Sequence, residues 1–457
     1  MNDVFRIFCR VRDVRPLPVL IVLTVLAGLI LAARPAAEQA DQTLWTFAAT
    51  HAQALESPDA AGVTPLESYA KATHRTVEIA RVEPRPMALR LHSLLAGDDP
   101  GSLPDVVQLE MGTAVSLLDR PADEIGLLPL DDLLERDGLR DQFLPQRLAA
   151  WQRDGTTYGL PMDVHPVALA YRVDLWQAAG LDPTAAATWQ EFALLAERYT
   201  AHWSAAGHPE RTAIEFARTT SEHLTLLLQQ QGIDFGVELD DERVTATVRF
   251  AAERLADGTA RPTSAGHARW ARDFAAGDVG VLWMPDWRVA YLELAAPELA
   301  GKAALMPLPR FSIDDAPTAS WGGTMLSIPA GVDDAEAAWK LAKFVAIDPA
   351  SLAGRRRVTA ILPALPSAWG EAVTPSNFWA EPPVETYAQL APLLPETRPS
   401  TRDRTAAGLL SLILSQSVDD LDAGLDLTTF DQRLRERLSD AQREVDRRSA
   451  FREHQLQ

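Results

Sequence analysis

The sequence predicts an α/β fold. From residue 43 onward, short β-rich runs alternate with helical patterns, and two complete β–α steps fall within residues 43–110. This alternation is typical of parallel or mixed sheets covered by helices. The 457 residues, 47% of them hydrophobic, are enough for at least one large core. A doubly wound lobe is therefore the expected arrangement of the first part of the chain.

The elements of this first part follow from short hydrophobic runs and the turn residues between them. We expect strands at 43–49, 76–82 and 105–110, with helices at 65–72 and 86–96 between them.

The middle of the chain begins with an extended run, PMDVHPVALAY, that passes into a helix ending near Gly180. A second helix starts at Thr188, where Glu191 three residues later completes a capping box. The later pattern predicts strands at 279–285, 304–309 and 323–331, and helices at 221–232, 242–258, 267–278, 287–295, 334–347 and from about 401 to the end.

The N-terminus has the pattern of an export signal. Arg6, Arg10, Arg12 and Arg15 precede an uninterrupted apolar run at 17–33, which is longer than the usual core of a signal peptide. Residues 1–40 are therefore a signal peptide or a signal anchor, and both possibilities remain open. In either case the arginines stay in the cytoplasm, and the chain after about residue 40 is exported.

Composition excludes several classes of function. The net charge of −20 argues against binding to nucleic acid, which needs a basic surface. A single cysteine, Cys9, excludes an internal disulfide. We find no GxSxG elbow, Walker loop or HExxH motif and no histidine pair at metal-binding spacing, so we expect no catalytic residue, no metal and no cofactor.

Three segments together resemble a known family. These are YGLPMDVHPVALAYRVDLWQAAGLDP, FAAGDVGVLWMPDW, and ASWGGTMLSIPAG with the helix EAAWKLAKFV that follows it. In this order they resemble the extracellular solute-binding proteins of the maltose-binding type, which serve carbohydrate ABC importers. The similarity runs from about Leu44 to Arg437. The sequence departs from the family pattern at Arg172, where Asn is usual, and at Asp286, where a small residue is common.

The resemblance implies a periplasmic-binding-protein-like fold, with two doubly wound α/β lobes joined by a hinge. Its domains would be residues 41–163 with 310–366 and residues 164–309 with 367–457. It implies an extracytoplasmic protein that captures a small polar solute, with a carbohydrate as the expected class, by hinge closure. The partners would be the transmembrane subunits of an ABC permease, and the membrane itself through the N-terminal segment.

Sugar sites combine aromatic rings with fixed polar groups. We therefore expect ligand contacts from carboxylates and a histidine near strand ends, from tryptophans, and from a glycine pair that permits close backbone approach. By resemblance, Trp287 lies where the family stacks a ring, although each tryptophan has the alternative of packing in a core. We expect Arg172 and Arg288 to be solvated or salt-bridged. The candidate ligand-binding residues are Trp45, Glu110, Asp163, His165, Trp283, Asp286, Trp287, Trp321, Gly322, Gly323 and Trp379.

Two other functions remain open on sequence alone. An exported glycosidase or lyase needs a pair of acids flanking one bond, and Glu110 with Asp163 is one such pair. A membrane-tethered sensor would bind the same solute but report it to a partner.

Overall fold

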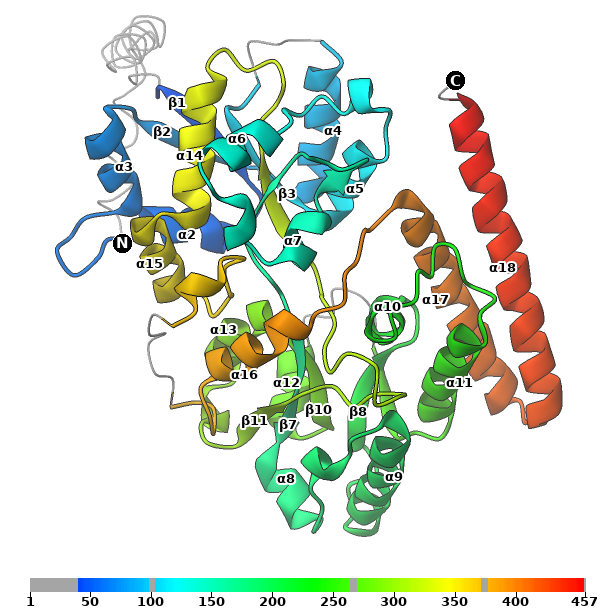
Figure 1. Cartoon of the computed structure of the whole chain (residues 1–457). Helices are drawn as coiled ribbons and strands as arrows, with labels where there is room; N and C mark the ends of the chain where they lie inside the picture. Colours follow the sequence, from blue (N-terminus) through cyan, green and yellow to red (C-terminus); the bar gives the residue numbers. More distant parts are fainter. Residues whose placement is uncertain (1–39, 98–102, 264–268, 371–376, 456–457) are drawn as a thin grey trace, which may run out of the picture. The chain divides into compact units, whose positions relative to one another are not determined.

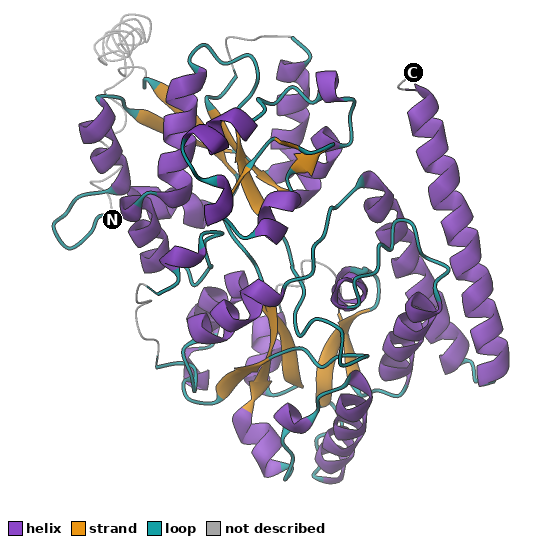
Figure 2. Cartoon of the chain, viewed as in Figure 1, coloured by secondary structure: helices purple, strands orange, loops and turns teal. Residues whose placement is uncertain are grey.

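Two five-stranded sheets form the centre of the structure, a computed structural model, and helices surround the strands of each (Figures 1 and 2). The structure describes residues 40–457 except 98–102, 264–268, 371–376 and 456–457. The expected signal or anchor segment therefore lies outside the described residues. In the described part, no helix is both long and apolar enough to span a bilayer.

The first sheet has the strand order β2-β1-β3-β12-β6. Strand β1 pairs in parallel with β2 and β3, whereas β12 is antiparallel to both β3 and β6. The strands are β1 (Gln42–Thr46), β2 (Val77–Arg81), β3 (Val106–Glu110), β6 (Leu160–Pro161) and β12 (Thr324–Ser327).

The helices of this first lobe alternate with its strands. They are α2 (Ala49–Glu56), α3 (Pro65–Thr73), α4 (Pro84–Leu95), α5 (Met111–Leu118), α6 (Asp131–Arg136), α7 (Pro145–Ala149), α14 (Ala335–Ile347) and α15 (Pro349–Val358). A two-stranded ribbon, β4 (Gln152–Arg153) with β5 (Thr156–Thr157), lies in the same lobe. Trp339, fully buried on α14, lies in the core beneath the sheet.

The second sheet has the order β11-β7-β10-β8-β9. Its strands are β7 (Val167–Arg172), β8 (Thr212–Ala217), β9 (Ala260–Thr263), β10 (Val279–Pro285) and β11 (Ala303–Met306). Strand β7 is antiparallel to β10 and β11, while β8 is parallel to β9 and β10. The carboxyl ends of β8 and β10 therefore lie at the same edge as the start of β7, next to the crossing from the first lobe.

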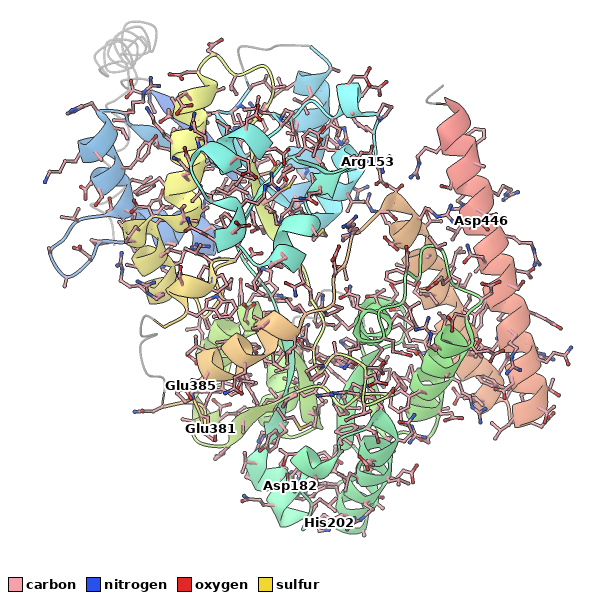
Figure 3. The ribbon with its side chains drawn as sticks, viewed as in Figure 1. Arg153, Asp182, His202, Glu381, Glu385 and Asp446 are labelled. Atoms are coloured by element: carbon pink, nitrogen blue, oxygen red, sulfur yellow. The ribbon has the colours of Figure 1, made fainter. Side chains whose placement is uncertain are left out.

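The helices of this second lobe include the two longest in the structure. They are α8 (Val173–Ala178), α9 (Trp189–Ala205), α10 (Glu222–Gln230), α11 (Glu242–Ala256), α12 (Trp270–Ala276), α13 (Asp286–Ala295), α16 (Pro383–Leu390), α17 (Thr401–Asp422) and α18 (Leu427–Gln455). Phe430 and Leu434 on α18 are buried against α17 and α11, and Arg402 on α17 pairs with Asp446 on α18, which is labelled in Figure 3.

Three crossing segments, residues 162–166, 320–323 and 359–365, connect the two lobes. Asp163 forms a bridge with Pro363, and Pro166 forms one with Ser320, so the segments lie beside one another. Residues between β11 and the second crossing, such as Ala319, belong to the core of the second sheet. The lobe boundaries at 163 and 310 stay a prediction.

The α/β architecture is confirmed, and most expected elements are present within a few residues. The capping box of α9 is present: Thr188 accepts from the Glu191 backbone, and the Glu191 side chain accepts from the Thr188 N–H. The strand expected at 43–49 was too long, since β1 ends at Thr46 and α2 starts at Ala49. Helices α2, α5, α15 and α16 and strands β8 and β9 are among the elements that were not expected.

Candidate functional site

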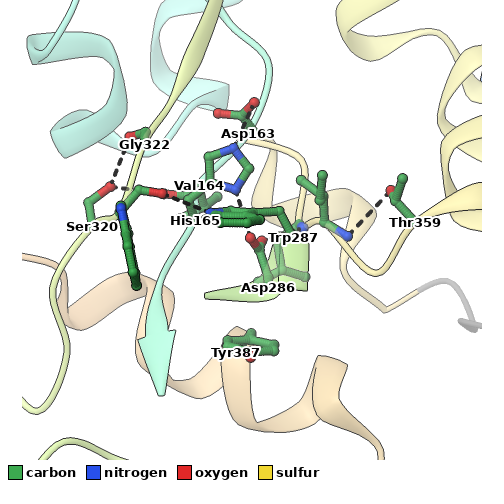
Figure 4. Close-up of polar contacts among 12 residues, drawn as sticks. Asp163, Val164, His165, Asp286, Trp287, Ser320, Gly322, Thr359 and Tyr387 are labelled. Carbon is green, nitrogen blue, oxygen red and sulfur yellow. Dashed lines mark hydrogen bonds and ion pairs between the residues drawn. The ribbon is translucent and has the colours of Figure 1, made fainter. Parts of the chain in front are cut away.

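Charged and hydroxyl side chains from both lobes meet where the crossing segments run side by side. We call this group the crossing cluster; it consists of Arg147, Asp163, His165, Asp286, Ser320 and Thr324. Its centre is the His165 ring, which lies between two carboxylates (Figure 4). The Nδ1 atom of His165 is 2.7 Å from Asp286 Oδ1, and its Nε2 atom is 3.2 Å from Asp163 Oδ2. All three side chains are buried.

Each carboxylate also accepts a hydrogen bond from the backbone of another part of the chain. Asp163 accepts from the Thr324 N–H at 2.9 Å and from the Thr324 hydroxyl. Asp286, at the start of α13, accepts from the Leu362 N–H at 3.0 Å. The histidine and its two acids therefore tie the first crossing to the third and to the start of β12, directly after the second.

Arg147 is the second buried cation of the cluster. Its Nε donates to the Asp163 carbonyl at 2.9 Å, and one Nη donates to the Ser320 hydroxyl at 3.0 Å. The other Nη lies 3.6 Å from the Asp163 carboxylate. Gly323 passes so close that a Cβ there would lie 2.1 Å from this guanidinium. Only glycine leaves room for the arginine at this point.

The electrostatics keep His165 charged. Burial disfavours the imidazolium, but Asp163 and Asp286 outweigh it and raise the pKa of His165 to about 10. Burial likewise opposes ionisation of Asp163, yet His165, Arg147 and the Thr324 hydroxyl hold its pKa below the usual range. At neutral pH the cluster is therefore a cation between two anions, with Arg147 as a further cation.

An aromatic pair lies beside the crossing cluster. Trp287 and Trp321 are both partly exposed, and their rings meet edge to face with centroids 5.8 Å apart at 78°. The Trp287 indole N–H donates to the Trp321 carbonyl at 3.1 Å, and the Trp321 N–H donates to the His165 carbonyl. We call these two rings the indole pair. They combine accessible aromatic surface with a fixed position.

Three other candidate tryptophans lie in cores. Trp45 packs under the Arg90 guanidinium, which is 4.4 Å from its ring centroid. Trp283 is fully buried between Trp189 and His223. Trp379 is 5% exposed and belongs to the core around α13 and α16. These three rings therefore pack in cores, which is the alternative to ligand contact that the sequence left open.

The remaining candidates lie near the second crossing. Glu110 caps α5 by accepting from the Thr113 N–H at 2.9 Å, so its carboxylate is directed toward its own helix. It lies opposite Thr324 in the β3–β12 ladder. Gly322 and Gly323 have φ of 100° and 143°, values that other residues rarely adopt.

Several residues of this region were not singled out from the sequence. Arg147, Ser320 and Thr324 belong to no recognisable motif. The contacts of Arg147 with Ser320 and of Asp163 with Thr324 join residues more than 150 positions apart in the sequence. Arg172 and Arg288 were expected to be either solvated or salt-bridged, and both are ion-paired. Within the described residues, no group of three or more potential ligands is placed to hold a metal.

Comparisons with known proteins agree on one family. Residues 66–385 match the family model described as bacterial extracellular solute-binding protein. The chain is 26% identical over 284 residues to an arabinooligosaccharide-binding protein of Bacillus subtilis, covering 61% of this chain and 62% of that one. It is 26% identical over 257 residues to a lactose-binding protein of Rhizobium radiobacter, covering 54% and 57%. The match thus spans less than two thirds of these relatives.

Solved structures share the fold. The sugar-binding protein MalE of Xanthomonas citri superimposes with a TM-score of 0.70 at 19% identity, over 90% of this chain and 99% of that one.

Proposed function

Because this chain belongs to the bacterial extracellular solute-binding proteins, we propose that it captures a sugar or oligosaccharide outside the cytoplasm and delivers it to an ABC permease. The single observation that carries the ligand class is the indole pair, Trp287 and Trp321, held at the carboxyl end of the second sheet beside the crossings. Open α/β sheets bind ligands at this edge. The relatives named for arabinooligosaccharide and lactose point the same way.

In this proposal the solute lies between the lobes, against the indole pair, and closure occurs by bending at the crossing segments. Glu110, Gly322 and Gly323, which lie near the second crossing, are the proposed contacts from its first-lobe side. Asp163, His165 and Asp286 keep one another satisfied, so we propose that they set the geometry of the crossings. The solute is released unchanged, since no chemistry is required of the site.

We further propose that residues 1–40 direct export, with 17–33 cleaved or kept as an anchor in the inner membrane. The permease is then reached from the periplasmic or outer side.

The first test is a thermal-shift screen of the full-length chain in mild detergent against arabinotriose, lactose, maltose, polyols and sugar phosphates. A ligand at about 100 times its dissociation constant adds about 2.7 kcal/mol to the unfolding free energy. A raised melting temperature with the sugar recovered intact supports the proposal. A sugar that is consumed would favour an exported hydrolase or lyase, and no response to any sugar would reject a carbohydrate ligand.

The second test locates the site by calorimetry with the responding sugar. Trp287→Ala and Trp321→Ala should each weaken binding roughly tenfold, since one aromatic contact contributes about 0.5–1.5 kcal/mol beyond its buried area. Tyr291→Ala is the matched control, because Tyr291 is 57% exposed on the same helix, α13. Equal affinities for all three variants would place the ligand elsewhere.

A further inference from the structure

One arginine of the second lobe is enclosed by three indoles. The Cζ atom of Arg288 lies 4.6 Å from the ring centroid of Trp321, 4.8 Å from that of Trp270 and 5.3 Å from that of Trp287. All three tryptophans are partly exposed, and the Arg288 side chain is 12% exposed. The guanidinium thus lies among the three rings.

An ion pair and a hydrogen bond to buried groups hold the Arg288 guanidinium in place. One Nη lies 3.3 Å from the Glu215 carboxylate and 3.0 Å from the Trp283 carbonyl. Glu215 is itself buried at 3% exposure on β8. Among the described residues, the Arg288 Nε has no hydrogen-bond partner. A guanidinium anchored at one end and in contact with rings at the other can hold those rings in a defined orientation.

The three tryptophans come from separate parts of the chain. Trp270 starts α12, Trp287 lies in the first turn of α13, and Trp321 belongs to the second crossing. Only one hydrogen bond, from the Trp287 indole to the Trp321 carbonyl, links two of them directly. Arg288 contacts all three, so it is the group that couples them.

We propose that Arg288, held by Glu215, is a positioning residue that orients Trp270, Trp287 and Trp321 as one stacking platform for the solute. This inference rests on the proposed function and adds Trp270 to the aromatic surface. A planar guanidinium can stack on aromatic rings, whereas the ammonium group of lysine has no plane to stack. Arg288→Lys therefore keeps the charge beside Glu215 and removes the platform's support.

Arg172 provides a matched control. It is also a buried, ion-paired arginine of the second lobe, but it lies at the other end of β7, bound to Asp174 and to the Phe274 carbonyl. Arg172→Lys should lower the stability of the lobe and leave Trp287 and Trp321 unaltered. Trp270 is left out of this comparison, because Arg172 binds the far end of its helix, α12. If Arg288 were merely structural, its lysine variant would behave in the same way.

The experiment compares full-length wild type, Arg288→Lys and Arg172→Lys by calorimetry with arabinotriose, lactose and maltose, and by ¹⁹F NMR of 5-fluorotryptophan-labelled protein. We expect Arg288→Lys to weaken binding at least fivefold and to shift or broaden the resonances of Trp270, Trp287 and Trp321, assigned through single Trp→Phe variants. Arg172→Lys should leave the affinity and the Trp287 and Trp321 resonances as in wild type. Unchanged platform resonances in Arg288→Lys, or an affinity within twofold of wild type, would overturn the inference.

The two readouts separate this inference from the proposed function. If no sugar binds the wild type, the proposed function fails, while the resonances alone still decide whether Arg288 orients the rings. If wild type binds a sugar and Arg288→Lys binds it equally, the function stands and the positioning role is wrong.

Discussion

His165 and Asp286 lie 121 residues apart in sequence, yet their side chains are joined by a 2.7 Å contact. The backbone of His165 is in the left-handed region, with φ of 55°. A non-glycine residue there is strained by roughly 1–3 kcal/mol. The ion pairs to Asp286 and Asp163 stabilise this conformation, which directs the ring between the two acids.

Replacing His165 by Gln should destabilise the protein by about 3–5 kcal/mol, because two buried carboxylates would lose the imidazolium between them. The loss should depend on pH. The folded pKa of about 10 exceeds the unfolded value near 6.5, so the contribution of His165 is complete below about pH 6.5 and declines as pH rises toward 10. Urea unfolding at pH 5.5, 7.5 and 9.5 measures this difference between wild type and variant.

The control is His208→Gln, since His208 pairs with Glu210 at the surface. It should change stability by less than about 0.5 kcal/mol at each pH. A difference between wild type and His165→Gln that stays constant from pH 5.5 to 9.5 would contradict a charged His165.

Gly323→Ala should destabilise by roughly 1–3 kcal/mol, because it combines an unfavourable φ of 143° with a clash against Arg147. Thermal unfolding checks the direction. Gly408→Ala, in α17 with open space around the added methyl, should instead stabilise by about 0.5–1 kcal/mol. If both variants shifted the melting temperature in the same direction, the close approach at Gly323 would not matter.

Thr188→Ala should cost about 1 kcal/mol through loss of the capping box of α9. Chemical denaturation of the purified chain measures the change. Thr188→Ser retains the hydroxyl that accepts from the Glu191 N–H and should stay within a few tenths of a kcal/mol of wild type. Equal losses in both variants would show that the threonine methyl, rather than the cap, is responsible.

Leu434→Ala should cost about 2–5 kcal/mol, because Leu434 is fully buried where α18 packs in the core of the second lobe. Leu427→Ala, 52% exposed at the start of the same helix, should have an effect below about 0.5 kcal/mol. Comparable losses from the two leucines would mean that α18 is not docked as described.

The elements that sequence predicted best are those with local signals. The capping box at Thr188 and the glycine at 180 depend on residues only a few positions apart, and the structure confirms both. Helix α15 also carries local signals, since Asp348 caps its start, Pro349 is its first residue and three arginines lie in its last turn, so it was predictable although it was not predicted. Its place is set by tertiary contacts, including the approach of Gly354 to the Ala54 carbonyl.

The candidate site was predictable in part for the same reason. The sequence singled out Trp287, Trp321 and the acids at strand ends. It could not distinguish a partly exposed ring such as Trp321 from a buried one such as Trp283, because burial depends on which helices cover each strand end. Nor could it pair Arg147 with Asp163 or Arg288 with Glu215, since these contacts exist only once the sheets are formed.

The strand order has a consequence for the sequence of events as the chain is made. All strands of the second sheet lie between residues 167 and 306, whereas the first sheet needs β12, at Thr324–Ser327, between β3 and β6. During synthesis from the N-terminus, the second sheet therefore has all its strands while β3 still has an unpaired edge. Such an edge is a site for wrong association. A chain that stopped before Thr324 would contain every strand of the second sheet and a first sheet without the strand that links β3 to β6.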